Sequence, residues 1–374
     1  MDKNTTFDTV IIGAGLSGLS LAHQLANQGV HCAVLDKKEI YPNAFRADKL
    51  EHNQIAALRD AKLDQFIVQK SVQIGHIKSC RSGVIVDEDT IDQYGFSYPA
   101  TVNNLRENLP EKVHFELATV TKIENSATVQ KITTSLGKTL SAKVIVISTG
   151  GNESVTKLVG ISRRLNPELN SLTFGFDVAR TDKKPFDFRG FSYHSEDPTS
   201  GVDCANFFLI GDDMRVNVFA QWDAKDEKAV AMRKNPIGEM SKYFEKLYDY
   251  VGEIEIITKV QAFPTHFYRV KNHIQPGLVV IADEYQSVSP ATGRGLDKLT
   301  TDVHLLAQKY IPEWLRIGKA DKKDIAKYYK DREKIKADQQ ARSDWVYYRN
   351  RFVGKKATIS ERIHNKIKAK LDLI

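Results

Sequence analysis

A strand, a glycine-rich turn, a helix and a second strand follow one another at the start of this chain. A short apolar run leads directly into Gly13-Ala14-Gly15-Leu16-Ser17-Gly18, and an apolar-periodic helix follows. In this βαβ context Gly13 makes a tight turn, Gly15 lets the backbone approach a pyrophosphate, and Gly18 lets helix and strand pack closely. The free N–H groups and partial positive charge of the helix start favour phosphate groups. The pattern therefore predicts a dinucleotide site on a Rossmann-type sheet.

The second strand of this unit ends on Asp36, eighteen residues beyond Gly18. A carboxylate at this place accepts hydrogen bonds from the ribose of an adenosine. A glycine-rich turn that merely packs is the alternative for a lone motif. Because strand, helix, second strand and acid all occur in order, we expect a bound dinucleotide, which from this stretch alone is either NAD or FAD.

Length and composition set further bounds. The chain has 374 residues, of which 41% are apolar, so it can bury a large core. No uncharged apolar run reaches the roughly 18 residues of a membrane-spanning helix, and the N-terminus lacks the pattern of a signal peptide. We therefore expect a cytoplasmic protein. The three cysteines, Cys32, Cys80 and Cys204, are scattered without ligand spacing, which argues against a metal site or a disulfide framework.

Two later strands end in loops that suit a nucleotide. Residues 144–148 form a continuous apolar run of the parallel-sheet kind, followed by Gly150 and Gly151. Residues 277–283 form another such run that ends on Asp283, and a glycine-bearing loop leads from it into a helix over 297–310. Ligands bind at the carboxyl ends of strands in open α/β sheets, so we expect both loops at the dinucleotide site. The second loop favours FAD over NAD.

Between these two loops the pattern changes to short β-type runs separated by turn residues. Such runs over 173–178, 190–194, 206–210 and 216–222 predict an antiparallel sheet, which a helix over 236–250 and a strand over 253–263 complete. We expect an α/β fold: a Rossmann-type, glutathione-reductase-like FAD-binding domain with an inserted antiparallel β-sheet substrate domain and C-terminal helices. The expected boundaries are 1–72, 97–165 and 272–318 for the discontinuous FAD-binding domain, 73–96 and 166–271 for the substrate domain, and 319–374 for the C-terminal helical segment.

With these motifs in this order, the chain resembles the FAD-dependent aromatic hydroxylases, a superfamily that also includes flavin-dependent halogenases and prenyl-lipid reductases. The resemblance covers residues 7–310 and implies noncovalently bound FAD. Matched residue by residue, it assigns cofactor-binding roles to the glycines Gly13, Gly15 and Gly18, the ribose-binding acid Asp36, the FAD-side Arg46, the ribityl- or phosphate-binding Asp283, and Pro290, Gly293 and Gly295 of the loop against the isoalloxazine ring.

Two departures from the family concern the flavin surroundings. The loop at Gly150 takes the place of an Asp-Gly-x-x-Ser-x-x-Arg motif that serves both FAD and nicotinamide binding, but Gly150 replaces the Asp and Thr156 replaces the Arg. After the last strand, the usual Gly-Asp-Ala-Ala-His reads Ala282-Asp283-Glu284-Tyr285-Gln286. Use of NAD(P)H as reductant is therefore left open, and a separate flavin reductase is the alternative source of reduced flavin.

The resemblance implies a monooxygenase in which reduced FAD forms a peroxyflavin with O₂ and oxygenates a small organic substrate, aromatic or unsaturated. The protein would orient the substrate and keep water out. Candidate positioning residues in or just after the antiparallel sheet are Arg189, Tyr193, His194, Gln221, His266, Tyr268 and Arg269. We rank His194 and His266 first as catalytic residues, because imidazole titrates near neutrality and can deprotonate a phenol. The alternative for each is an ordinary strand or turn residue.

Other functions remain open at this stage. One is a FAD-dependent reductase or dehydrogenase of a prenyl or polyketide-like compound, and another is a flavin-binding protein without catalysis. A flavin-dependent halogenase is disfavoured, since none of Trp222, Trp314 and Trp345 lies in the Trp-x-Trp-x-Ile-Pro stretch of that branch.

The end of the chain carries a basic amphipathic pattern. Ile359, Ile363, Ile367 and Leu371 recur every four residues among lysines and arginines. Such a helix either binds a carrier protein or an anionic membrane surface, or packs its apolar stripe on the flavin domain. Nucleic acid is not expected as a partner, since no recognition module is present.

Overall fold

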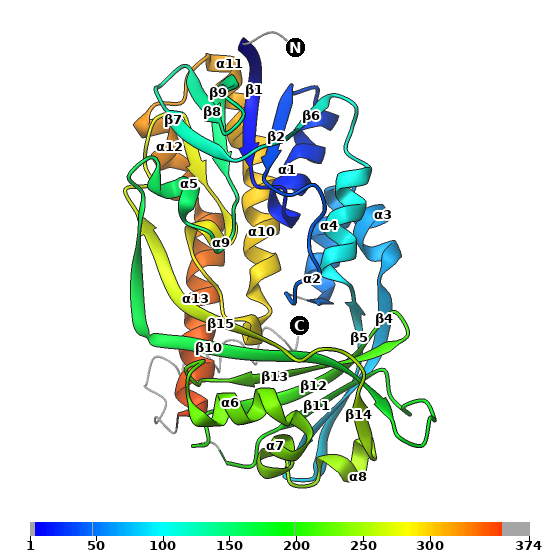
Figure 1. Cartoon of the computed structure of the whole chain (residues 1–374). Helices are drawn as coiled ribbons and strands as arrows, with labels where there is room; N and C mark the ends of the chain where they lie inside the picture. Colours follow the sequence, from blue (N-terminus) through cyan, green and yellow to red (C-terminus); the bar gives the residue numbers. More distant parts are fainter. Residues whose placement is uncertain (1–3, 47, 198, 354–374) are drawn as a thin grey trace.

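The structure, a computed structural model, describes residues 4–46, 48–197 and 199–353, which form two β-sheets with helices around them (Figure 1). The basic amphipathic helix expected after residue 354 lies outside the described residues. None of the helices in the described ranges is long and apolar enough to cross a membrane.

The first sheet carries the predicted βαβ unit. Its strand order is β6-β2-β1-β9-β8-β7, and β16 pairs with the end of β9. Neighbouring strands among β6, β2, β1, β9 and β16 are parallel, whereas β7, β8 and β9 form an antiparallel meander. The strands are β1 (Asn4–Ile12), β2 (Cys32–Asp36), β6 (Val113–Leu117), β7 (Val120–Glu124), β8 (Gln130–Thr134), β9 (Thr139–Ile147) and β16 (Leu278–Val280).

Continuous apolar runs explain why β1, β2, β9 and β16 lie at the centre of this sheet. Their residues are buried on both faces and belong to one hydrophobic cluster with the helices that cover the sheet. Up to residue 285 the helices of this cluster are α1 (Leu16–Asn27), α2 (His52–Asp60), α3 (Asp64–Ile67), the 3-10 turn η1 (Val68–Lys70), α4 (Tyr98–Glu107), α5 (Ser154–Lys157) and α9 (Ala282–Tyr285), and helices of the C-terminal part also belong to it.

The second sheet is mostly antiparallel and lies below the first in Figure 1. Its strand order is β14-β10-β13-β12-β11-β4-β5-β3, with β15 paired to β10, and only the β11–β4 pair is parallel. The strands are β3 (Lys49–Leu50), β4 (Val72–Arg81), β5 (Val84–Gly95), β10 (Ser162–Arg180), β11 (Gly190–His194), β12 (Val202–Ile210), β13 (Asp213–Ala220), β14 (Ile254–Ile256) and β15 (Gln261–Lys271).

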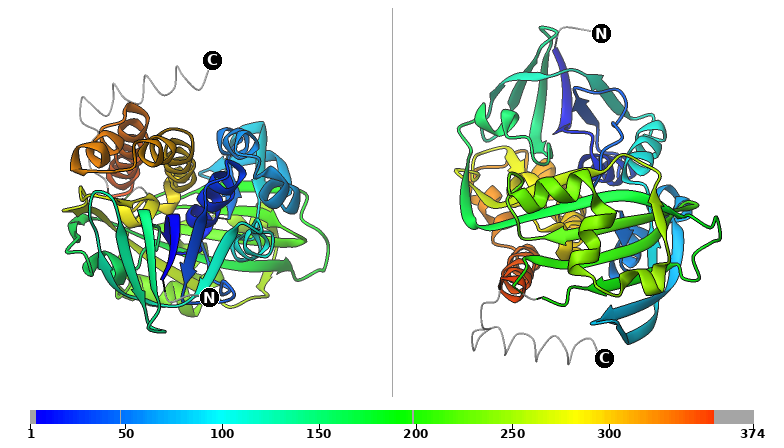
Figure 2. Two further views of the ribbon diagram at one scale, coloured as in Figure 1. Left: turned by 90° about the horizontal axis from the view of Figure 1, so that it is seen from above. Right: turned by 60° about the horizontal axis from the view of Figure 1, so that its bottom comes forward.

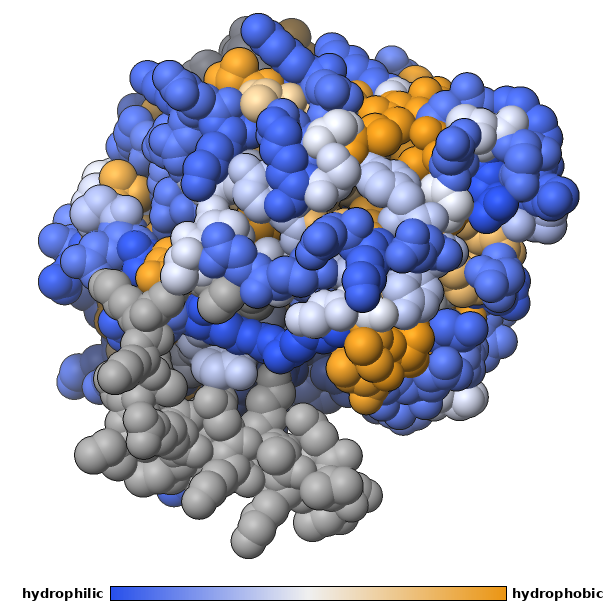
Figure 3. Space-filling view, turned by 90° about the horizontal axis from the view of Figure 1, so that it is seen from below, coloured by the Kyte–Doolittle hydropathy of each residue, from blue (hydrophilic) through white to orange (hydrophobic). Residues whose placement is uncertain are grey.

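The second sheet has one covered face and one face toward the first sheet. Three short helices, α6 (Glu227–Lys234), α7 (Pro236–Tyr243) and α8 (Leu247–Val251), pack on its far face and form a separate core with Phe174, Phe176 and Phe207 (Figure 2). Because side chains alternate along a strand, the neighbours of these phenylalanines, such as Thr173, Asn206 and Phe208, lie on the opposite face and line the cavity with the FAD motifs. From below, the molecule is mostly hydrophilic, with apolar side chains in separate patches (Figure 3).

The element boundaries correct the sequence expectations in three places. The strand expected over 277–283 ends at Val280, and Asp283 lies in the short helix α9 that follows it. The helix expected over 236–250 is divided into α7 and α8, because the chain leaves the helical conformation at Phe244. The strand expected over 253–263 is two strands, β14 and β15, which pair with different parts of the long strand β10.

The C-terminal part of the described chain is helical and connects the two sheets. The helix α13 runs from beside the first sheet down to the second (Figure 1). The elements here are η2 (Pro290–Thr292), α10 (Arg294–Leu305), the π-helical turn η3 (Leu306–Tyr310), α11 (Ile311–Ile317), α12 (Lys322–Tyr329) and α13 (Arg332–Phe352).

Candidate active site

One cavity of about 1210 Å³ lies between the carboxyl ends of the strands of the first sheet and the face of the second sheet that is turned toward them. Its lining includes almost every residue that the sequence predicts for the site: Gly13, Gly15, Asp36, Arg46, His194, His266, Asp283, Pro290, Gly293 and Gly295. Gly18 is the exception, because it is buried beneath the turn rather than exposed to the cavity.

The glycine turn has the close contacts that its sequence predicts. Gly13 has φ +109°, and a Cβ there would lie 2.6 Å from the carbonyl oxygen of Ser148. A Cβ at Gly18 would lie 2.0 Å from the carbonyl oxygen of Gly13. Both positions therefore exclude a side chain, so the turn can run tightly between β1 and α1.

The start of α1 presents backbone N–H groups to the cavity. Gly15 is its N-cap residue and provides no side chain to cap the helix. The hydroxyl of Tyr98, at the start of α4, accepts a hydrogen bond from the backbone N–H of Leu16 at 3.4 Å. Burial raises the pKa of Tyr98, so its hydroxyl stays protonated and neutral beside the helix start. This geometry suits a pyrophosphate.

Asp36 is held at the end of β2 by the glycine turn itself. Its Oδ2 accepts a hydrogen bond from the backbone N–H of Ala14 at 2.7 Å, and its Oδ1 accepts one from Lys38 at 2.9 Å. Arg106 on α4 fixes the same turn, because its Nη2 donates to the carbonyl of Ala14 at 3.0 Å and lies 3.9 Å from the Asp36 carboxylate. The carboxylate faces the cavity where an adenosine ribose would bind.

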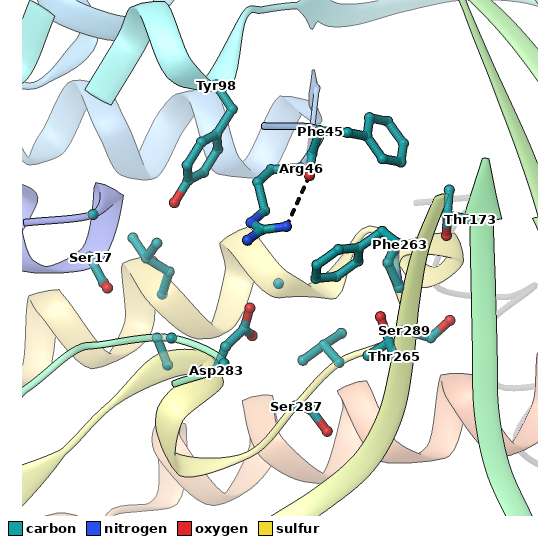
Figure 4. A pocket seen from close by; sticks show the side chains of 18 of the residues that line it. Ser17, Phe45, Arg46, Tyr98, Thr173, Phe263, Thr265, Asp283, Ser287 and Ser289 are labelled. Atoms are coloured by element: carbon teal, nitrogen blue, oxygen red, sulfur yellow. Dashed lines mark hydrogen bonds between the residues drawn. The ribbon is translucent and has the colours of Figure 1, made fainter. Parts of the chain in front are cut away.

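Arg46 and Asp283 face each other across the cavity (Figure 4). The guanidinium of Arg46 lies 4.3 Å from the ring centroid of Phe263 and donates to the carbonyl of Phe45 at 3.1 Å. The side chain of Asp283 is exposed to the cavity, yet protein surrounds that cavity on most sides. The resulting loss of hydration raises the pKa of Asp283, although the positive charges of Lys298 and Arg46 lower it in part.

The loop after Asp283 turns into α10 through a left-handed glycine. Gly293 has φ +67° and is the N-cap residue of α10, and its carbonyl accepts a hydrogen bond from the side chain of Gln54 at 3.0 Å. Lys298, by contrast, points away from the cavity: it is buried, and its Nζ donates to the carbonyl of Gln286 at 2.5 Å.

The Gly150 loop also borders the cavity. The Arg position of its motif falls on Lys157 and not on Thr156, so a cation is kept there, but Lys157 is exposed and pairs with Glu153. A different cation, Arg163, donates to the carbonyl oxygens of Gly151 at 2.9 Å and Gly150 at 3.3 Å.

A polar cluster lies in the wall formed by the second sheet. His194 of β11 pairs across the sheet with Cys204 of β12, and a register shift in β12 brings Asp203 into the same group. Ligand atoms of the three side chains lie within 4.8 Å of one another. Burial, followed by the charges of Arg81 and Arg351, lowers the pKa of His194 to about 4. Burial raises the pKa of Asp203 to about 7. The imidazole of His194 is neutral at neutral pH, because its own pKa lies well below 7.

The remaining candidates divide between the cavity and the protein interior. His266 and Tyr268 line the cavity from β15, and His266 is exposed. The other four, Arg189, Tyr193, Gln221 and Arg269, do not line it. Several cavity-lining side chains have a buried polar atom without a hydrogen-bond partner among the described residues: Thr173, His194, Asp203, Asn206, Asn217 and Thr265.

The residues present fit FAD. The excluded side chains at Gly13 and Gly18, the uncapped start of α1 and the acid at the end of β2 suit its adenosine and pyrophosphate groups. The cavity continues from there past Arg46 and Asp283 to the Pro290 loop, so one extended ligand can contact all of these residues.

Comparisons with known proteins agree with this fit. The family model described as "FAD binding domain" matches residues 6–343 of the chain. Curated proteins include no significant sequence match to it.

Several solved structures share the fold at low identity. One is p-nitrophenol 4-monooxygenase PnpA from Pseudomonas putida DLL-E4, with a TM-score of 0.73 and 18% identity over 97% of this chain and 93% of that one. PqsL of P. aeruginosa in complex with 2-aminobenzoylacetate has a TM-score of 0.67 and 17% identity over 94% and 99%. The flavin-dependent brominase Bmp2 has a TM-score of 0.68 and 16% identity over 92% and 88%.

The match over residues 6–343, together with the cavity that carries the family's motifs, confirms both the fold class and the use of FAD. The chain is an FAD-dependent oxidoreductase that belongs to the FAD-binding-domain family.

Proposed function

We propose that this protein is a monooxygenase that uses noncovalent FAD to insert one oxygen atom into a small aromatic or unsaturated substrate. The observation that carries the proposal is that the lining of one cavity includes both the FAD motifs and strands of the second sheet. A substrate on the sheet side would therefore lie against the flavin. PnpA and PqsL, which share the fold, are described as monooxygenases.

Bound and reduced FAD supplies the reaction with O₂, and the protein binds and orients the substrate. The rings of Phe208, Phe219 and Phe263 line the cavity and suit a flat apolar body. Thr173 and Thr265 line it as well and offer hydroxyl groups to polar substituents. Burial of this wall keeps water from the reacting atoms.

His194 is our candidate base for a substrate hydroxyl. Its lowered pKa makes the imidazole neutral at pH 7, and its Nδ1 has no hydrogen-bond partner among the described residues. A neutral imidazole can accept the proton of a phenol, and the buried Asp203 nearby stabilises the cation that forms. His266 stays the second candidate, at an exposed position on β15.

The source of electrons is tested first. The purified protein is expected to be yellow, and NADH or NADPH is added without oxygen while the flavin absorbance is followed. Bleaching shows that the chain accepts hydride directly; no bleaching with either, together with normal O₂ reactivity after chemical reduction, assigns reduction to a separate flavin reductase.

Oxygen insertion is tested on the reduced holoprotein. Phenols, aminobenzoyl compounds and unsaturated ketones are offered with ¹⁸O₂, and the products are examined by mass spectrometry. One ¹⁸O atom per product supports the proposal. Reduced or dehydrogenated products without ¹⁸O favour the reductase or dehydrogenase alternative, and halogenated products in the presence of bromide favour a halogenase. A reduced flavin that never reacts with O₂ would leave a flavin-binding protein without catalysis.

A further inference from the structure

Glu284 is a fully buried carboxylate directly after the cavity residue Asp283. Its Oε2 accepts a hydrogen bond from the hydroxyl of Thr149 at 2.9 Å, and its Oε1 accepts one from the hydroxyl of Thr156 at 2.9 Å. Nη2 of Arg163 lies 3.3 Å from Oε2. These partners come from the end of β9, from α5 and from the start of β10, so one carboxylate joins three other segments to α9.

Arg163 extends the connection to both loops of the FAD site. Besides Glu284, it binds the carbonyl oxygens of Gly150 and Gly151. Its guanidinium also lies 4.0 Å from the ring centroid of Tyr268, whose hydroxyl donates to the carbonyl of Asp283 at 2.7 Å. The pair therefore fixes the Gly150 loop relative to the short helix α9, which carries Asp283.

The loop that this pair holds lies directly on the glycine turn. A Cβ at Gly13 would lie 3.1 Å from the Cα of Thr149, the residue whose hydroxyl binds Glu284. A small displacement of Thr149 would therefore move the turn or open a gap beneath it. The geometry of the pyrophosphate site thus depends on a carboxylate that does not itself line the cavity.

We propose that Glu284 and Arg163 are a positioning pair. The pair holds the Gly150 loop against the helix α9, which carries Asp283, and thereby sets the affinity for FAD. The pair lies outside the motif at Gly150 and places one negative and one positive charge beside it. It concerns cofactor binding and is independent of the proposed oxygenation, since its test needs no turnover.

The first test compares charge-removing variants of the pair. Glu284→Gln keeps the shape of the side chain and removes its charge, and Arg163→Met removes the cation. Each is expected to raise the FAD dissociation constant of the holoprotein, measured by ultrafiltration and flavin absorbance, by about tenfold or more. The double variant is expected to bind FAD about as weakly as either single one, because residues that act as a unit give non-additive effects.

Glu313→Gln and Arg316→Met are the matched controls. They remove an exposed ion pair on α11, with Arg316 Nη2 2.8 Å from Glu313 Oε1, and are expected to leave FAD binding unchanged. Wild-type affinity in both Glu284→Gln and Arg163→Met would overturn the proposal, as would fully additive losses in the double variant. Circular dichroism establishes that each variant is folded. If Arg163→Met does not fold, Arg163→Lys, which keeps the charge but loses the fork of donors, replaces it in the same comparison.

A pH series separates positioning from simple structural support. Burial raises the pKa of Glu284 to about 7, against the opposing effects of Arg163, Thr149 and Thr156. The other titratable groups around it are Tyr268 on β15, Glu153 in the Gly150 loop and the adjacent Asp283. All of them remain in Glu284→Gln, so only Glu284 differs between the two proteins.

The wild-type protein should bind FAD more tightly than Glu284→Gln at about pH 8.5, where Glu284 is ionised, and with nearly equal affinity at about pH 5.5, where it is protonated. A constant ratio of the two dissociation constants across this range would show that the charge of Glu284 does not act on FAD, and would overturn the proposal.

Discussion

The ring of Phe45 lies directly on Gly175, so the segment that carries Arg46 rests on the second sheet. A Cβ at Gly175 would lie 2.4 Å from Cε2 of Phe45. The backbone N–H of Phe45 also donates to the side chain of Gln261 on β15 at 3.1 Å. The position of Arg46 in the FAD cavity therefore depends on contacts with strands β10 and β15, far away in the sequence.

Gly175→Ala is expected to displace Phe45 and with it Arg46. Overpacking of this kind costs about 1–3 kcal/mol, which corresponds to a loss of FAD affinity of roughly tenfold if the strain is relieved by moving the segment. The measurement is the FAD dissociation constant by flavin fluorescence. Phe45→Leu in the same protein makes room for the new methyl group and should restore much of the affinity; a Gly175→Ala protein with unchanged affinity would contradict the argument.

Gly18→Ala should damage the site by a different route. Its methyl group would meet the backbone carbonyl of Gly13 at 2.0 Å and the hydroxyl of Ser148 at 2.7 Å, and a backbone atom cannot turn aside as a side chain can. We expect the variant to purify with little FAD. We also expect the free energy of unfolding of the apoprotein to fall by roughly 1–3 kcal/mol, so that it unfolds at a lower temperature. Calorimetry of the apoprotein checks the second effect. Yellow protein with a wild-type unfolding temperature would show that α1 can shift to accommodate the side chain.

The parts of the site that could be predicted are those that a local pattern encodes. Gly13, Gly18 and Asp36 belong to one βαβ unit, and Asp283 closely follows an apolar strand, so their places at the site follow from neighbours in the sequence. The two sheets could be predicted for the same reason, since continuous and alternating apolar runs distinguish parallel from antiparallel strands. Boundaries near Phe244 and residue 257 were wrong because no proline or glycine marks either break.

The parts that could not be predicted depend on contacts between distant segments. Asp203 joins His194 only through the β11–β12 register and the irregularity in β12, neither of which a single sequence reveals. Tyr98 and Arg106 reach the glycine turn from α4, more than eighty residues away. The sequence does give one indication of Glu284, because a charged residue stands where the family usually has Ala. Nothing in the sequence indicates that Arg163 is its partner.

The titration of His194 should appear in the pH dependence of stability. Its folded pKa of about 4 lies below the unfolded value of 6.5, so the unfolded chain binds more protons between these values. The contribution of His194 to stability is complete above about pH 6.5 and is lost as the pH falls toward 4, by on the order of 2 kcal/mol. Urea unfolding of the wild type and His194→Asn at pH 7.5 and 5 measures the difference.

His194→Asn removes this one titrating group. Burial also lowers the pKa of His273 to about 4, but His273 is present in both proteins and contributes equally to each. The variant should lose less stability than the wild type on acidification. Equal losses in the two proteins would mean that burial does not lower the pKa of His194 in the folded protein.

A buried group of four charges behind the flavin loop predicts a large effect on stability. Nζ of Lys334 lies 2.8 Å from Asp302 and 3.3 Å from Asp338, and Lys298 lies 3.7 Å from Asp338. Asp302 also accepts a hydrogen bond from the backbone N–H of Ala282 at 2.8 Å, so the group reaches the residue before Asp283. Both lysine side chains are almost fully buried.

Lys334→Met is expected to destabilise the protein by about 3–5 kcal/mol, because it leaves two buried carboxylates with one cation between them. Lys336→Met, at an exposed position on the same helix, is the control and should change stability by less than about 0.5 kcal/mol. The free energy of unfolding in urea compares the three proteins at pH 8, where both carboxylates are ionised in the unfolded chain. If Lys334→Met matches the control, Lys298 alone must neutralise both acids, and Lys298→Met should then show the full loss.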